Sequence, residues 1–293
     1  MNSPQQIWKT RLAPTPSGYL HLGNALSFAL TAGIAEHMGA KTLLRIDDLD
    51  RQRVEEKYVM DIFDTLEFLG IPHHEGPDNY PEYLSRYSQI HRTGLYNSAL
   101  KDLREKGTIF ACTCSRTQVP NGIYPGTCRN KHIPLDHPDV NWRLRTNETA
   151  LTVHTLRGEK ITATLPPEMQ DFVIRKKDGF PAYQLASLVD DHFFGINLII
   201  RGEDLWPSTL AQLYLAEVLD YQPFRNAVFH HHPLLLTGNR KLSKSAGDTS
   251  IGFLCKAGKT PEEVYGMIAQ MLGIATPVSG CSSLTRAVIP WLS

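Results

Sequence analysis

Strand-like and helix-like segments alternate over the first hundred residues of this 293-residue chain. The segment IWKTRLAP at 7–14 and the apolar run TLLRI at 42–46 are typical of strands. Between them, apolar residues at 22–34 recur with the spacing of one helical face. Further helices are predicted at 59–69 and 83–106. Strands joined through helices predict an α/β fold with a Rossmann-like parallel sheet.

The middle of the chain interrupts this pattern. Between 108 and 170 the periodicity weakens, and Cys, Pro, Gly and Asn become frequent, which predicts an inserted module. The α/β pattern resumes with DFVIRKK and NLIIR and a helix after them, and the tail contains one clear helix with Thr260 as its N-cap. We therefore expect two halves of one domain at 1–107 and 171–236, the insertion at 108–170, and a lysine-bearing loop with a short helical region at 237–293.

Composition limits the classes of protein to which the chain can belong. Lys plus Arg and Asp plus Glu number 30 each, so no overall basic charge indicates a nucleic-acid partner. The N-terminus lacks the pattern of a signal peptide, and no apolar run approaches the roughly 18 residues that span a bilayer. Five cysteines, three of them crowded together, argue against a disulfide framework. We expect a cytoplasmic monomer that does not contact a membrane.

The stretch RLAPTPSGYLHLGNAL at 11–26 joins the first strand to the first helix. A helix that begins near Gly23 directs its unpaired N–H groups and positive dipole end toward this loop, which suits the phosphates of a nucleotide. His21 and Asn24 lie close to that end and are candidate phosphate contacts. Without other evidence, a packed or capping histidine is the more common outcome.

A second basic segment, KLSKS at 241–245, follows a tight-turn sequence. Lysines on a loop are usually solvated surface. Alone, Lys241 and Lys244 therefore indicate exposed surface, and a further role for them depends on what else the chain provides.

Three cysteines lie within 17 residues of the predicted insertion: Cys112, Cys114 and Cys128. This spacing favours a small zinc site, because Zn²⁺ binds four ligands in a tetrahedron. From chemistry alone, His132 is the first candidate for the fourth ligand and His137 the second. Three unpaired structural thiols are the alternative. Cys255 and Cys281, and the histidines at 230–232, are predicted to be structural.

HLGN and KLSKS together resemble the paired HIGH and KMSKS signatures of class I aminoacyl-tRNA synthetases. The resemblance implies a Rossmann-like domain that activates an amino acid by attack of its carboxylate on the α-phosphate of ATP, with Mg²⁺. It implies catalytic roles for His21, Asn24, Lys241 and Lys244. It further implies that His21, Gly23, Asn24 and Lys244 bind ATP.

RLAPTPSGYLHLG, LLRIDDLD, GFPAYQLASLVDDHFFGINLIIRGEDL and KLSKS resemble the glutamate-specific enzymes and their short relatives. Transferred position by position, the resemblance places six residues around glutamate: Arg11, Ala13, Thr15, Asp47, Tyr183 and Arg201. Arg201 suits the γ-carboxylate because a guanidinium binds a carboxylate through two parallel hydrogen bonds. A structural ion pair of Arg201 with Glu203 or Asp204 is the alternative.

One position departs from the glutamate pattern. Asp47 stands where these enzymes usually have Glu, as the acid that would hold the substrate's α-ammonium group. The shorter side chain resembles that of glutaminyl enzymes, so a preference for glutamine is an alternative that Arg201 opposes.

Only 48 residues follow Ser245, whereas full-length glutamyl-tRNA synthetases continue into an anticodon-binding domain. With the cysteine-bearing insertion, this length resembles the family of glutamyl-queuosine tRNA(Asp) synthetases. That resemblance implies Tyr124 as the fourth zinc ligand. It also implies glutamate activation without tRNA, followed by transfer to queuosine at the wobble position of tRNA(Asp).

Three alternatives remain open from the sequence. A truncated enzyme that charges the 3′ end of tRNA(Glu) or tRNA(Gln) is one. A non-catalytic paralogue that binds amino acid or RNA is another, which Asp47 supports and the lysines oppose. A third is a different adenylate-forming ligase, such as a pantothenate-making enzyme, which Arg201 and the cysteines make improbable.

Overall fold

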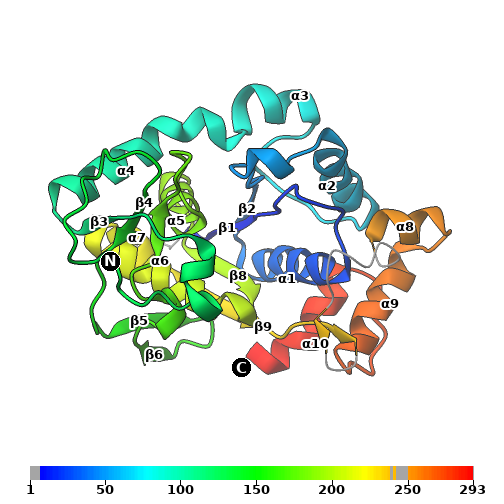
Figure 1. The fold of residues 1–293 in the computed structure, drawn as a ribbon. Coiled ribbons are helices and arrows are strands. Elements are labelled where there is room, and N and C mark those ends of the chain that lie inside the picture. The colour runs from blue at the N-terminus through cyan, green and yellow to red at the C-terminus, as the bar shows by residue number, and fades with distance from the viewer. Residues whose placement is uncertain (1–6, 238–239, 242–249, 293) are drawn as a thin grey trace. The chain divides into compact units, whose positions relative to one another are not determined.

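The computed structural model describes residues 7–237, 240–241 and 250–292, and its chain divides into two compact units. The first unit comprises 1–91, 198–203 and 230–293, and the second comprises 92–197 and 204–229. Figure 1 shows the fold coloured along the chain. The predicted insertion at 108–170 falls within the second unit, which extends beyond it on both sides. Among the described residues, no helix combines the length and the apolar character needed to cross a membrane.

The first unit is built on parallel strands. Strands β1 (Lys9–Leu12) and β2 (Lys41–Leu44) pair in parallel, with Arg11 opposite Leu43, and β8 (Leu198–Gly202) contacts β1. The described elements of this unit also include α1 (Leu22–Met38), α2 (Glu56–Phe68), α3 (Tyr80–Glu82), β10 (Leu236–Thr237), β11 (Arg240–Lys241), α8 (Ile251–Lys256), α9 (Pro261–Met271) and α10 (Cys281–Leu292). The parallel pairing and the helices between strands confirm the predicted α/β class.

Helix α1 is buried over most of its surface, in keeping with its apolar sequence. It begins at the N-cap His21 and ends at Gly39, whose φ of 64° is a left-handed conformation that favours glycine. Helix α10 packs against α1 at Gly33, where a Cβ atom would lie 1.8 Å from Oγ1 of Thr285. Only glycine therefore allows this approach of the two helices.

The second unit contains an antiparallel sheet, β3–β4–β7, formed by Ile109–Cys112, Asn141–Leu144 and Val173–Arg175. A hairpin of β5 (Leu151–Thr155) and β6 (Lys160–Ala163) adjoins the start of β9 (Val228–His232), which pairs in parallel with β5 and continues into the first unit. The helices are α4 (Thr93–Glu105), α5 (Tyr183–Phe193), α6 (Trp206–Leu219) and α7 (Gln222–Arg225). Antiparallel strands and short turns explain the weak periodicity of this part of the sequence.

The single helix predicted at 83–106 is wrong. The chain makes a π-helical turn at Tyr83–Tyr87 and a 3₁₀ turn at Gln89–Arg92, and α4 begins at Thr93. The cause is Asp48, whose carboxylate accepts hydrogen bonds from Tyr83 Oη (2.7 Å), Ser88 Oγ and the Gln89 backbone N–H (2.8 Å). These contacts hold Ser88 in an extended conformation with ψ of 139°, which ends the helical turn.

The tail contains more helix than the sequence indicates. The predicted capping box is confirmed at α9, where Thr260 Oγ1 accepts from Glu263 N and the Glu263 side chain accepts from Thr260 N. Helices α8 and α10 were not predicted, because both depend on contacts with α2 and α1.

Candidate active site and cysteine cluster

The segments that follow β1 and β2 run side by side in the first unit. Arg45 N donates to Leu12 O and Asp47 N donates to Pro14 O, both at 2.9 Å. Arg11 Nη1 lies 3.4 Å from the carbonyl oxygen of Ile200 in β8, immediately before Arg201. The structure therefore gathers Arg11, Asp47 and Arg201 at one part of the first unit, with Ala13 and Thr15 on the connecting segment.

The Asp47 carboxylate is fixed by a buried partner that the sequence analysis missed. Arg45 donates from Nε to Oδ1 at 2.7 Å and from Nη2 to Oδ2 at 3.0 Å. Asp47 is 9% exposed and Arg45 is 3% exposed. A signal was present, because residues two apart on an extended strand face the same side. The paired acid is thus held in one orientation before any ligand arrives.

Arg201 is buried in β8 next to a histidine. Burial and the nearby Arg201 guanidinium lower the pKa of His231 to about 3, so this imidazole is neutral at ordinary pH. Histidines 230–232 lie on β9, and the electrostatics of His231 involve Arg201. With His231 neutral, the positive charge of this pair is that of the Arg201 guanidinium.

The start of α1 is organised by His21 and Asn24. His21 Nδ1 accepts from Gly23 N at 3.0 Å, and Asn24 Oδ1 accepts from His21 N at 3.1 Å, which completes a capping box. Because Nδ1 is an acceptor, the ring proton lies on Nε2, where it can be donated. A Cβ on residue 23 would come within 3.0 Å of the His21 ring, which explains the glycine.

The structure does not test the placement of three further predicted residues beside this group. Tyr183 begins α5 in the second unit and its side chain is 44% exposed. Lys241 ends strand β11, and Lys244 lies outside the described residues.

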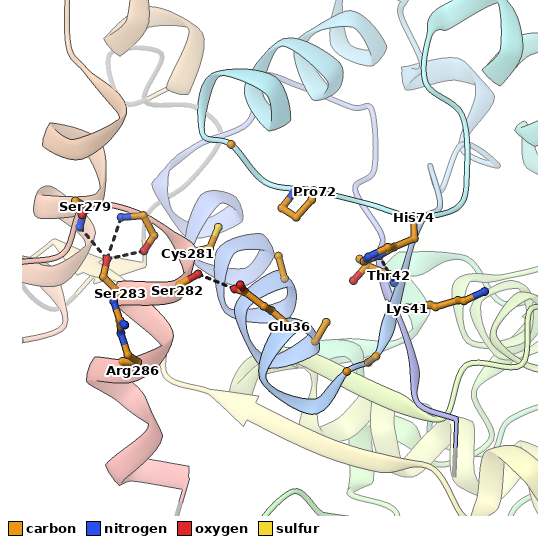
Figure 2. Close-up of a pocket in the computed structure, with 16 residues that line it drawn as sticks. Glu36, Lys41, Thr42, Pro72, His74, Ser279, Cys281, Ser282, Ser283 and Arg286 are labelled. Carbon is orange, nitrogen blue, oxygen red and sulfur yellow. Dashed lines mark hydrogen bonds between the residues drawn. The ribbon is translucent and has the colours of Figure 1, made fainter. Parts of the chain in front are cut away.

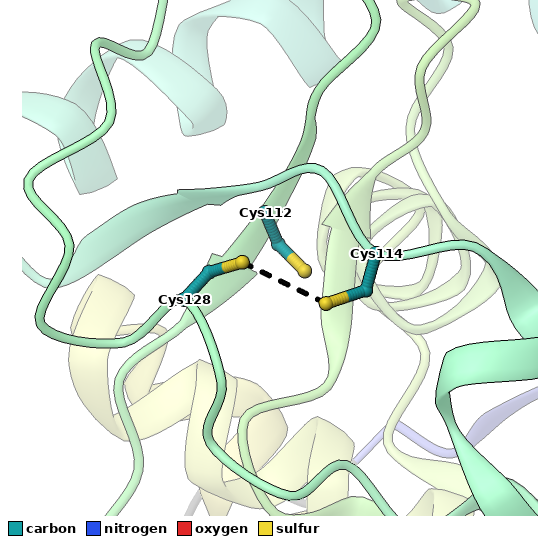
Figure 3. A group of neighbouring side chains, drawn as sticks. All are labelled: Cys112, Cys114 and Cys128. Atoms are coloured by element: carbon teal, nitrogen blue, oxygen red, sulfur yellow. Dashed lines mark hydrogen bonds between the residues drawn. The ribbon is translucent and has the colours of Figure 1, made fainter.

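The three cysteines of the second unit are brought together as predicted. Figure 3 shows the side chains of Cys112, Cys114 and Cys128 converging from β3 and the loops that follow it. Their sulfur atoms lie within 4.8 Å of one another, and all three residues are buried. Burial raises the pKa of Cys114 to about 11. The pKa of Cys128 is about 7, because hydrogen bonds from Thr113 and the neighbouring thiols outweigh the opposite effect of burial.

The structure distinguishes among the candidates for a fourth ligand. Tyr124 packs in the same buried cluster as the cysteines, and its Oη accepts from Cys128 N at 2.7 Å. The guanidinium of Arg143 lies 3.8 Å from the centre of the Tyr124 ring. Burial, together with the neighbouring Cys112 and Cys128, raises the pKa of the Tyr124 phenol. His132 and His137 are exposed. Three buried thiols are compatible with Zn²⁺, which Cys thiolates bind, and Tyr124 is the oxygen donor that lies beside them.

A surface pocket of about 720 Å³ also lies in the first unit, and none of the predicted site residues lines it. Figure 2 shows it between the end of α1, the start of β2, the segment from Gly70 to His74, and the start of α10. Glu36 accepts from Ser282 Oγ at 2.6 Å across it. Its exposed Lys41, His74 and Arg286 accompany this acid, so the pocket has mixed charge.

Comparison with known families now identifies the class. The chain matches the family described as "tRNA synthetases class I (E and Q), catalytic domain" at residues 8–122 and 143–279. The chain therefore belongs to this family of ligases, whose members use ATP and Mg²⁺.

Individual relatives refine the comparison. The Glutamyl-Q tRNA(Asp) synthetase of Symbiobacterium thermophilum is 34% identical over 90% of this chain and 86% of its own length. The protein of the same name from Parasynechococcus marenigrum is 35% identical over 94% of this chain and 87% of its own length. Glutamate–tRNA ligase 2 of Syntrophus aciditrophicus is 35% identical over 92% of this chain, which spans 58% of that relative.

Solved structures agree on the fold. The glutamate–tRNA synthetase of Elizabethkingia anophelis gives a TM-score of 0.76 at 24% identity, covering 96% of this chain and 65% of that one. A glutamate tRNA ligase from Elizabethkingia meningosepticum, solved in complex with its amino acid, gives a TM-score of 0.74 at 24% identity. That comparison covers 96% of this chain and 64% of the other.

Proposed function

We propose that the chain activates L-glutamate with ATP, without RNA, and then transfers it to queuosine at the wobble position of tRNA(Asp). In the first step a glutamate α-carboxylate oxygen bonds to the α-phosphorus of ATP. The bond from that phosphorus to the bridging oxygen breaks, and pyrophosphate leaves. In the second step a hydroxyl of the queuosine cyclopentenediol attacks the acyl carbon, an ester forms, and AMP leaves.

The observation that carries this proposal is the gathering of Arg11, Asp47 and Arg201 in the first unit. Two guanidinium groups and one carboxylate complement an amino acid that has one ammonium and two carboxylates. Arg201 is proposed to bind the γ-carboxylate, and Asp47 the α-ammonium. The pairing of Asp47 with Arg45 orients the acid, so the substrate does not have to order it.

The start of α1 supports ATP binding. His21 Nε2–H and the helix N-terminus are proposed to donate to phosphate oxygens, on which charge develops as pyrophosphate leaves. Gly23 allows the phosphates a close approach. Asn24 fixes the His21 backbone and so acts on the same contact. Lys241 and Lys244 are proposed to complete the site, as the KMSKS resemblance implies.

Cys112, Cys114, Tyr124 and Cys128 are proposed to hold a zinc ion. Zinc bound there would cross-link β3 to the loop that follows it and stabilise the second unit. The relatives named Glutamyl-Q tRNA(Asp) synthetase, together with the resemblance of this cluster to the short glutamate-activating enzymes, support queuosine as the acceptor.

The acceptor is tested with radiolabelled glutamate and four RNAs. We expect transfer to tRNA(Asp) that contains queuosine, unchanged when the 3′-terminal adenosine is removed. We expect no transfer to tRNA(Asp) with guanosine at the wobble position, and none to tRNA(Glu). Labelling of tRNA(Glu) would instead establish an enzyme that charges the 3′ end. The same would follow if labelling of tRNA(Asp) disappeared when its 3′-terminal adenosine is removed.

A further inference from the structure

A second pocket of about 720 Å³ lies in the first unit between α2 and α8. None of the residues proposed to bind glutamate or ATP lines it. The lining residues come from the loop before His21, from α2 and from the start of α8: Tyr19, Lys57, Met60, Asp61, Asp64, Thr65, Phe68, Ser250, Ile251, Gly252, Phe253, Cys255 and Lys256.

The outer wall of the pocket is apolar and open to solvent. Tyr19, Met60 and Phe253 are 47%, 40% and 48% exposed. Large apolar side chains that are exposed together around a hollow are typical of binding sites rather than of ordinary surface. The wall therefore suits a flat apolar group of aromatic size.

The floor of the pocket is polar. Asp61 and Thr65 are four residues apart on α2, so they share one helical face, and they are only 7% and 2% exposed. Among the described residues, the Thr65 hydroxyl has no hydrogen-bond partner. A buried hydroxyl in this state costs free energy that a ligand could recover.

Asp61 has one oxygen engaged and one available. Its Oδ2 accepts from Leu20 N at 2.7 Å, and this is the one hydrogen bond to its carboxylate recorded for the described part of the chain. Its Oδ1 faces α8, where a Cβ on Gly252 would lie 3.1 Å from it. Burial raises the pKa of Asp61, while the Leu20 N–H opposes this effect. The carboxylate is thus partly desolvated, and a hydrogen-bond donor would stabilise its charged form.

Asp61 is the buried charged group of the pocket, whereas the other charged lining residues are exposed. Asp64 and Lys256 act on the pKa of Asp61 in opposite directions, Asp64 raising it and Lys256 lowering it. Lys57 pairs with Glu55 at 2.6 Å. An anionic ligand group at the floor would meet the Asp61 carboxylate, whereas a protonated amine would be attracted to it.

We propose that this pocket binds a small molecule that has an aromatic-sized apolar body and one protonated amine. The amine donates to Asp61 Oδ1 and Thr65 Oγ1, and the body packs against Met60 and Phe253. This proposal does not rest on the proposed function, because it uses none of the same residues.

The experiment titrates 2-phenylethylamine into the full chain and follows the Met60 methyl signal by NMR. 2-Phenylethanol is the neutral control and 3-phenylpropionate the anionic control. We expect the amine to bind about tenfold more tightly than the alcohol, as one charge-assisted hydrogen bond predicts, and the acid to bind more weakly than both. Equal affinity of the three compounds, or preference for the acid, would overturn the proposal.

Three variants locate the binding. Asp61→Asn keeps an acceptor for Leu20 N and is expected to abolish the preference for the amine over the alcohol. Thr65→Val removes the hydroxyl at nearly constant volume and is expected to weaken amine binding. Phe253→Ser, at an exposed position where folding is not at risk, is expected to weaken all binding. Phe193→Ser, at the exposed Phe193 of the second unit, is the matched control. Unchanged amine affinity in Phe253→Ser would place the ligand elsewhere and overturn the proposal.

Discussion

The two candidate sites of this molecule are built in different ways. The group around Arg11, Asp47 and Arg201 is assembled from three strands or strand ends that are far apart in the sequence. The cysteine cluster draws its thiols from 17 consecutive residues of one strand and its following loop. The first depends on the parallel strands being in place, whereas the second depends on local chain geometry. This difference predicts which substitutions affect chemistry and which affect folding.

The largest effect is expected at Arg201. In Arg201→Ala, the γ-carboxylate of glutamate would lose its buried partner, which costs about 2–5 kcal/mol. This corresponds to a loss of about 30-fold or more in kcat/KM for glutamate-dependent pyrophosphate exchange. Arg201→Lys is expected to lose less activity than Arg201→Ala because it retains the charge, although it lacks the planar fork of the guanidinium.

The unfolding midpoint of each Arg201 variant controls for loss of structure. A variant that remains folded and keeps the parental kcat/KM for glutamate would remove Arg201 from the substrate site.

The cysteine cluster is expected to affect metal content and stability. Cys114→Ser should reduce bound zinc from about one ion per chain to a small fraction, because one of four ligands is lost. Zinc is measured by atomic spectroscopy, and unfolding by urea titration. Cys255→Ser changes an exposed cysteine outside the cluster and serves as the matched control. Parental protein without zinc would contradict the proposed metal site.

The packing of α10 against α1 supplies a third test. Gly33→Ala forces the new methyl group onto Thr285 and should destabilise the chain by about 1–3 kcal/mol. Gly266→Ala in α9 meets no atom within 4 Å and should be stabilising by about 0.5–1 kcal/mol. Urea unfolding of both variants measures the difference. Equal effects of the two substitutions would mean that α10 does not pack on α1 as described.

The smallest effect is expected at His231. Its pKa is about 3 in the folded chain and near 6.5 when unfolded, so the unfolded state binds more protons between these values. Stability therefore falls as the pH is lowered from 6.5 toward 3. At pH 5.5 this histidine should account for about 1.4 kcal/mol of the loss.

The His231 prediction is tested by measuring unfolding at pH 7.5 and pH 5.5. In His231→Gln, the loss of unfolding free energy between the two pH values should be smaller by about 1.4 kcal/mol. An identical loss in the parental chain and the variant would show that His231 is not held neutral by burial.

Local patterns predicted part of this molecule well. The capping box at Thr260 and the cysteine spacing are short-range signals, and both appear in the structure. The break at Ser88 could not be predicted from neighbours, because its cause is Asp48, 40 residues earlier. The partner of Asp47 was accessible in principle from the two-residue spacing to Arg45. The roles of the site residues remain predictions.

The most direct test of the account is a pyrophosphate-exchange panel across glutamate, glutamine and aspartate, with ATP and without RNA. We expect exchange with glutamate to exceed exchange with glutamine, and we expect that exchange to be lost in His21→Ala and Lys244→Ala. Exchange that is faster with glutamine, or that survives both substitutions, would contradict it.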